Sequence, residues 1–168
     1  LLRQALPAGH PSIAQSLNNL ANVYVSQGRY GAAEAGYQEA LALLRQALPA
    51  EHLLIASSLN NLAAVYELQE RYAEAEALFT KALGLRRAAL PAGHPSIAQT
   101  LHNLALAYKA QGRYAEAEAG YQEALALRRA ALPAGHPLIA QTLNNLANVS
   151  FSQERYAEAE ALCAEALE

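Results

Sequence analysis

Residues 11–47 read PSIAQSLNNLANVYVSQGRYGAAEAGYQEALALLRQA, and this stretch decides the fold. Its apolar residues recur at three- and four-residue steps in two successive runs, as they do along one face of an α-helix. Pro11 opens the first run and Gly28 separates it from the second, which are the places where helices commonly begin with proline and end with glycine. The stretch therefore predicts two helices, 11–27 and 30–47, joined by a short turn.

The same pattern returns at a fixed interval along the chain. Four gapless segments of equal length account for all 168 residues, and they span 1–42, 43–84, 85–126 and 127–168. A loop histidine and the tyrosine that opens the second helix recur in register: His10, His52, His94 and His136; Tyr30, Tyr72, Tyr114 and Tyr156. One helix pair cannot bury its apolar faces alone, whereas stacked neighbours can. We expect residues 1–168 to form one all-α solenoid domain of antiparallel helix pairs.

The recurring spacing within a segment carries a family resemblance. In the first segment it consists of Leu17, Leu20, Ala21, Tyr24, Gly28, Arg29, Tyr30, Ala33, Glu34, Ala35, Tyr37, Ala40 and Leu41. This pattern resembles the tetratricopeptide repeat, with leucine at 17 where the family usually has tryptophan. The segments are longer than the family's usual unit of about 34 residues, and they look like the subclass found in kinesin light chains and many bacterial multidomain proteins. The resemblance implies a right-handed superhelix and a fragment of a bacterial multidomain protein.

Composition narrows the classes of partner. Hydrophobic residues make up 53% of the chain and charged residues 16%, which favours a folded domain over a disordered one. The formal net charge of -3 supplies no basic field for nucleic acid. We read no run of about 18 apolar residues for a membrane span. The single cysteine, Cys163, excludes an internal disulfide and fits a reducing compartment. We therefore expect a cytoplasmic protein without nucleic-acid or membrane partners.

Both ends of the chain lack the polar cap that a solenoid end needs. Residues 1–6 read as the tail of a preceding second helix, and the last segment stops inside its own second helix. We expect the natural protein to continue in both directions, and the uncapped ends to favour self-association.

Between the first and third segments, about six of the ten differences lie in the first helix. Three of these positions share one helix face, since they are spaced by four and three residues. In tetratricopeptide proteins the equivalent face lines a concave groove that receives peptides. The resemblance thus implies a peptide-binding face made by Gln15, Asn18, Asn22, Val25, Asn60, Glu67, Gln99, His102, Leu106, Lys109, Gln141, Asn144, Asn148 and Phe151. Neutral drift at exposed positions is the competing explanation.

Adjacent asparagines give this face its chemistry, because an amide both donates and accepts hydrogen bonds. We expect the first residue of each pair to contact a partner backbone and the second to bond neighbouring first helices. Chaperone-binding family members hold a terminal carboxylate with Lys and Arg, whereas this face carries only Lys109 and Glu67 as charges. It therefore predicts a mostly neutral, amide-rich groove with an apolar end near Phe151.

Other recurring polar residues favour structural roles. Equivalent histidines should lie about 10 Å apart, which is too far to share a zinc ion. We expect them to cap or pack the first helices, and we predict no metal and no cofactor. Recurring arginines in the turns, such as Arg29, and glutamates such as Glu34 are expected to form salt bridges or solvated edges rather than an anion site. Cys163 occupies a packing position and is expected to be inert core, or partly exposed because nothing follows it.

The sequence predicts a protein-binding scaffold and no enzyme, because no nucleophile, base and orienting group recur together. The bound segment would belong to another protein. The alternative is a regulatory sensor arm or structural spacer of a larger signalling protein, without an independent ligand.

Overall fold

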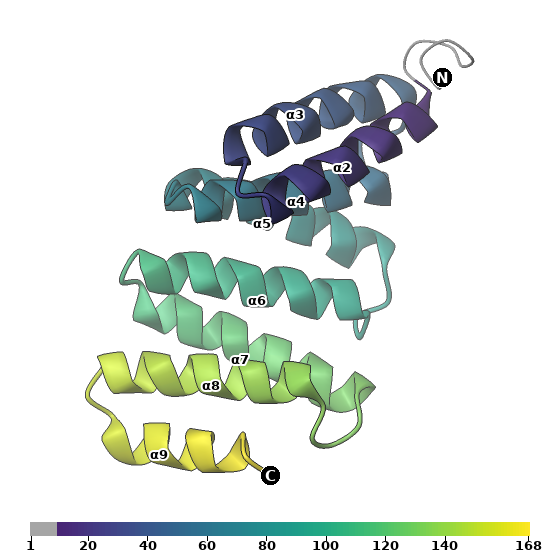
Figure 1. The fold of residues 1–168 in the computed structure, drawn as a ribbon. Coiled ribbons are helices and arrows are strands. Elements are labelled where there is room, and N and C mark those ends of the chain that lie inside the picture. The colour runs from purple at the N-terminus through teal and green to yellow at the C-terminus, as the bar shows by residue number, and fades with distance from the viewer. Residues whose placement is uncertain (1–9) are drawn as a thin grey trace. The chain divides into compact units, whose positions relative to one another are not determined.

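The computed structural model describes residues 10–168, which form eight helices and no strand (Figure 1). The helices are α2 Pro11–Ser26, α3 Tyr30–Ala47, α4 Leu53–Leu68, α5 Tyr72–Ala89, α6 Pro95–Ala110, α7 Tyr114–Ala131, α8 Pro137–Ser152 and α9 Tyr156–Glu165. The two helices predicted in the first segment are confirmed to within one residue, since α2 ends at Ser26 and Gln27 is its cap. Residues 1–6, read as the tail of a preceding helix, lie outside the described residues.

The loop histidines begin the first helix of every repeat. Each has extended backbone, and its Nδ1 accepts the N–H of the residue two positions later at 3.1–3.2 Å. Such a side-chain acceptor satisfies one of the N–H groups that a helix start leaves unpaired. The predicted capping role of His10, His52, His94 and His136 is confirmed.

The turn between the helices of a pair needs a left-handed residue. At Gly28, φ is +71°, and the N–H groups of Gly28 and Arg29 donate to Val25 O and Tyr24 O. This pair of hydrogen bonds is a Schellman cap, in which glycine carries no Cβ penalty. Gly112 adopts the same φ region, but Glu70 and Glu154 occupy it in the other two repeats, at φ +60° and +61°.

Replacing Glu70 or Glu154 with glycine should therefore stabilise the protein. A left-handed conformation costs a non-glycine residue about 1–2 kcal/mol, and the greater freedom of glycine in the unfolded chain offsets part of this gain. We expect a gain of about 0.5–1 kcal/mol per substitution in chemical denaturation. Gly112→Glu is the reverse control and should destabilise by a similar amount. Stabilisation by neither glycine variant would contradict this account of the turn.

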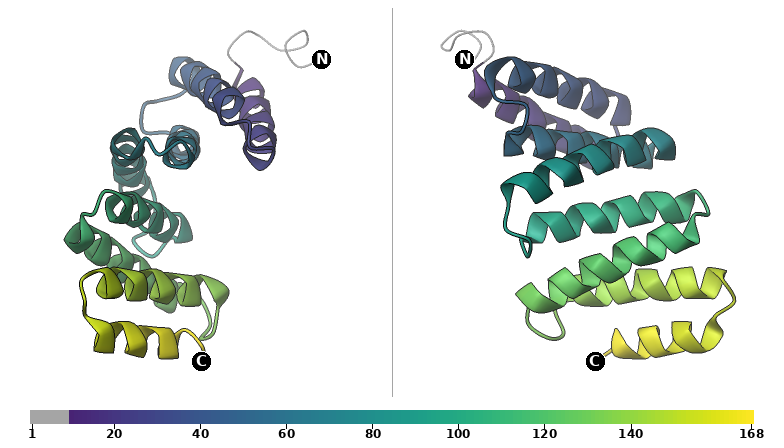
Figure 2. Two further views of the ribbon diagram at one scale, coloured as in Figure 1. Left: turned by 60° about the vertical axis from the view of Figure 1, so that its left-hand side comes forward. Right: turned by 180° about the vertical axis from the view of Figure 1, so that it is seen from behind.

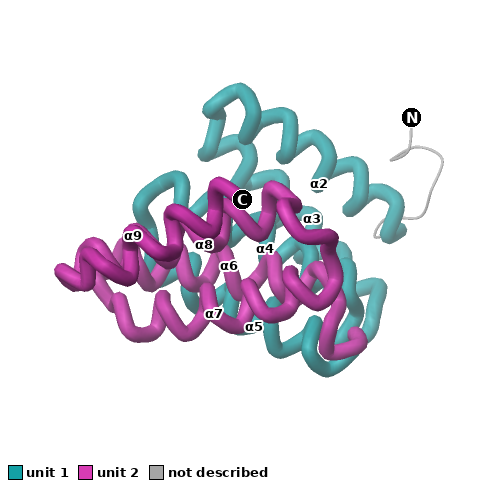
Figure 3. Tube along the Cα trace, turned by 90° about the horizontal axis from the view of Figure 1, so that it is seen from below, with its two compact units in different colours: residues 1–89 teal, residues 90–168 magenta. Residues whose placement is uncertain are grey.

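The helices fall into two compact units, residues 1–89 and 90–168, which Figure 3 colours separately. In unit 1, α2 packs on α3, α3 on α4, and α4 on α5. In unit 2, α6 packs on α7, α7 on α8, and α8 on α9. Paired helices run antiparallel within each unit (Figure 2). That the four repeats form one continuous domain stays a prediction.

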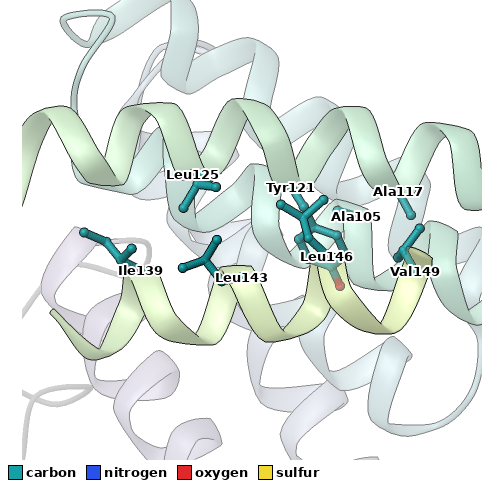
Figure 4. Packing of buried hydrophobic residues seen from close by; sticks show 8 residues of the cluster. All are labelled: Ala105, Ala117, Tyr121, Leu125, Ile139, Leu143, Leu146 and Val149. Atoms are coloured by element: carbon teal, nitrogen blue, oxygen red, sulfur yellow. The ribbon is translucent and has the colours of Figure 1, made fainter. Parts of the chain in front are cut away.

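Each unit has its own apolar core between successive helix layers. In unit 2, Tyr121 and Leu125 of α7 meet Leu143 and Val149 of α8, and all four are buried (Figure 4). In unit 1, the corresponding cluster joins α2, α3, α4 and α5 through Ala14, Leu41, Leu44, Ile55, Leu59 and Ala82. Small residues allow close approach: a Cβ on Gly120 would lie 3.0 Å from Ala105 Cβ. Within residues 10–168, no helix has the length and apolar character required to cross a bilayer.

Candidate functional site

The first asparagines of the pairs lie in different surroundings. Asn18 Nδ2 donates to Ser58 Oγ of α4 at 2.9 Å. Asn60 is 8% exposed, and its Oδ1 accepts from Arg86 Nη1 at 3.4 Å. Asn144, by contrast, is exposed on α8. Asn60 is therefore buried inside unit 1, whereas Asn18 is half-buried and its buried Oδ1 has no hydrogen-bond partner among residues 10–168.

His102 takes the place of this asparagine in the third repeat and lies at the centre of a buried polar cluster. It is 3% exposed, and its ring meets Tyr121 edge-on at 5.2 Å. Arg128 Nη1 lies 3.2 Å from His102 Nδ1, and the Asn145 amide lies 3.2 Å from Nε2. The predicted structural role of the second asparagine is thus realised at Asn145.

The arginine decides the tautomer of this histidine. A guanidinium can only donate, so His102 Nδ1 must accept and the ring must be neutral with its hydrogen on Nε2. Asn145 must then present its amide oxygen to Nε2, because amide oxygen and nitrogen are interchangeable in shape. Burial, followed by the charges of Arg128 and Lys109, lowers the pKa of His102 to about 4. His102 is therefore uncharged at neutral pH.

Two buried arginines were missed by reasoning from sequence. Arg86 and Arg128 are 8% and 3% exposed, and both occupy the register position held by the fully buried Leu44 in the first repeat. A change from leucine to arginine at one register position of the second helix was the available signal. Within unit 2, Arg128 forms a polar junction between α6, α7 and α8, where Leu44 makes an apolar one in unit 1.

Three other positions of the first helices belong to the predicted site and keep some exposure. Gln15, Gln99 and Gln141 are exposed, as are Asn22 and Asn148, while Leu106 is half-buried. At the next position along, Val25, Glu67 and Lys109 are half-buried and Phe151 is exposed. The Tyr37 hydroxyl donates to Asn22 Oδ1, which leaves the Asn22 amide N–H groups to other partners. Most of the predicted site thus remains accessible within each unit.

The exposed face of α8 is the most continuous of these surfaces. Gln141, Asn144, Asn148 and Phe151 follow one another at steps of three and four residues, and all are exposed. Phe151 is 63% exposed and meets Tyr156 of α9 edge-on at 5.4 Å. The opposite face of the helix packs into the core of unit 2. The predicted combination of amides and an apolar end is present on this single helix.

Two of the recurring turn arginines pair with glutamates of the preceding repeat. Arg71 pairs with Glu34 of the preceding repeat at 2.9 Å, and Arg155 pairs with Glu118 at 2.6 Å, as expected for salt bridges. Cys163 is exposed, in contrast to the buried core alternative. Among residues 10–168, no three histidine, cysteine or acidic side chains are grouped closely enough to hold a metal ion.

Comparison with protein families identifies the repeat. A model described as tetratricopeptide repeat matches residues 12–88 and 96–168. The chain belongs to the tetratricopeptide repeat family. Its general role is protein–protein interaction, which supports the coarser part of the functional prediction. The predicted fold class, an all-α solenoid of helix pairs, is confirmed by this membership. No curated protein matches the chain.

Solved structures show the same arrangement of helix pairs. BtubC (BKLC) from P. vanneervenii is 26% identical to this chain, with a TM-score of 0.88. The match covers 97% of this chain and 65% of BtubC. A candidate kinesin light chain of Podosopora anserina has nearly identical TPR-like repeats and is also 26% identical to this chain, with a TM-score of 0.81. The match covers 98% of this chain and 78% of that protein. The predicted kinesin-light-chain-like subclass is thereby confirmed. Apo RapI shares the fold, with a TM-score of 0.83 at 18% identity. The match covers 94% of this tetratricopeptide repeat chain and 55% of RapI.

Proposed function

We propose that this chain is a scaffold that binds a segment of another protein on the exposed faces of its first helices. The observation that carries the proposal is the accessible stripe of α8, where Asn144 and Asn148 precede the exposed Phe151. Amide side chains can hold a partner backbone, and an exposed aromatic ring supplies an apolar anchor. Buried Asn60 and His102 are left out of the contact surface.

The charge and polarity of the accessible residues in each unit determine which partner segments we expect it to prefer. In unit 2 the accessible positions comprise Leu106, Lys109, Asn148 and Phe151, which suit a segment with an apolar residue and a nearby acidic one. In unit 1 the equivalents are Asn22, Val25, Ala64 and Glu67, a set with smaller apolar side chains and the opposite charge. An exposed ion pair adds little affinity, so we expect Phe151 and the amides to dominate binding.

A peptide-display selection tests the proposal. Peptides recovered by the wild type should bind the double variant Asn148→Glu, Phe151→Ala at least tenfold more weakly, because an aromatic anchor contributes about 2 kcal/mol or more and the carboxylate repels backbone carbonyls. The matched control is Ala130→Glu, which adds the same charge to an exposed position of α7. Its binding should equal that of the wild type.

The other outcomes have distinct meanings. Binders that survive the double variant would move recognition to another surface and contradict the α8 site. Failure to recover any binder would favour the alternative function, a spacer or sensor arm whose face meets only its own parent chain. Localisation in the cytoplasm fits both functions and is proposed with them.

A further inference from the structure

Arg128 carries a buried positive charge that no carboxylate balances. Its side chain accounts for four hydrogen bonds: to Leu138 O at 2.8 Å, Thr142 Oγ1 at 2.5 Å, His102 Nδ1 at 3.2 Å and Gln99 Oε1 at 3.3 Å. All four acceptors are uncharged. None of the ion pairs among residues 10–168 includes Arg128. An uncompensated buried charge is costly, so its retention needs an explanation.

The repeat architecture does not require a cation at this place. Leu44 occupies the equivalent register position in the first repeat and is fully buried among apolar neighbours. A junction between repeats can therefore be built with leucine. Arg128 adds a charge where packing alone would accept an aliphatic side chain.

Part of the guanidinium retains donor capacity. Nη1 serves three of the four acceptors, Nη2 serves one, and Nε serves none. A guanidinium has five N–H groups, so Nε–H and one N–H of Nη2 have no acceptor among residues 10–168. Two N–H groups of one guanidinium can donate to the two oxygens of a carboxylate in a bidentate contact.

A cavity adjoins this side chain. It has a volume of about 230 Å³ and lies among the start of α6, the end of α7 and the start of α8. Arg128 and Gln99 line it together with mainly apolar residues, including Leu127, Leu132 and Leu138. A cavity of about 150 Å³ can hold benzene, so this one has room for a branched or aromatic group together with a carboxylate.

We propose that this cavity, which we name the Arg128 pocket, binds a carboxylate carried by a small apolar group. Arg128 would hold the carboxylate and the leucines would enclose the apolar group. The carboxylate could belong to a free organic acid or to the C-terminal residue of a peptide, since both present the same chemistry. The pocket is separate from the α8 face, so either site can fail without the other.

Titration with 3-phenylpropionate, followed by calorimetry and by the NMR signal of the Arg128 Nε–H, tests the proposal. The acid should bind at least tenfold more tightly than its uncharged amide and than acetate, which lacks the apolar group. An acetylated tripeptide ending in phenylalanine, compared with its C-terminal amide, distinguishes the peptide source from the free acid. Binding of either acid but not its amide supports the pocket. Equal binding of acid and amide, no binding of either acid, or binding of inorganic anions only would overturn it.

Variants place the binding in the cavity. Arg128→Leu, which installs the side chain of the first repeat, should abolish acid binding, whereas Arg129→Leu on the exposed face of α7 should leave it unchanged. Ala131→Phe fills the pocket from its α7 wall while keeping Arg128, and it should also abolish binding. This second variant keeps the test decisive if Arg128→Leu does not fold. Phe151→Ala should leave acid binding unaltered, and acid binding retained by both pocket variants would contradict the proposal.

Discussion

Phe79→Ala is expected to lower the free energy of unfolding by about 3–5 kcal/mol. Phe79 on α5 is 0% exposed, and Tyr37 and Tyr121 at the equivalent positions of other repeats are also buried. Truncating a fully buried ring removes both its transfer free energy and the contacts around the resulting cavity. Chemical denaturation followed by helical circular dichroism measures the loss.

Cys163 provides a matched control for this prediction, because it holds the same register position as Phe79. It is exposed on α9. Cys163→Ala should therefore change the free energy of unfolding by less than about 0.5 kcal/mol, as surface substitutions usually do. Phe79→Ala and Cys163→Ala, at one register position, would then differ by several kcal/mol in their effect on the free energy of unfolding. Similar effects of the two would contradict the assignment of Phe79 to the core.

Acidification from pH 6.5 to pH 4 is expected to destabilise the protein through His102, by about 3 kcal/mol when the shift is complete. The pKa of His102 is lowered from 6.5 to about 4 by burial and by the charges of Arg128 and Lys109. In this window the unfolded chain binds a proton that the folded protein does not, so stability rises with pH. The contribution of His102 is fully present above pH 6.5 and is lost as pH falls towards 4.

His102→Asn is the control, since asparagine occupies the equivalent positions Asn18, Asn60 and Asn144. All other residues are identical in the two proteins, so the difference between their pH profiles isolates His102. Denaturation of both at a series of pH values should give a shallower profile for the variant below pH 6.5. Parallel profiles would show that His102 does not titrate as its burial requires.

Much of the local structure could be predicted from one repeat. Helix periodicity, the histidine caps and the left-handed turn at Gly28 all depend on residues a few positions apart. The candidate site was predictable only in part. The Gln15, Asn22 and Val25 positions keep some exposure, whereas Asn60 and His102 are buried by side chains from other helices. Sequence periodicity places such residues on a helix face but does not say what covers it.

Arg128 is a charged residue whose burial could not be predicted from the sequence. Its charge indicates a solvated position near a helix end, yet it is 3% exposed and bonds residues up to 29 positions away. The cavity beside it exists only where the ends of α6, α7 and α8 meet.

By itself, the sequence determined the four helix pairs, their boundaries and the tetratricopeptide family, because those features depend on short-range periodicity that returns in each of the four segments. Only the tertiary structure decided which equivalent side chains are exposed. Asn144 is exposed while His102 at the same register position is buried. The physical reason is that solvation depends on the neighbouring repeat: Asn145, which contacts His102, lies 43 positions away in the chain.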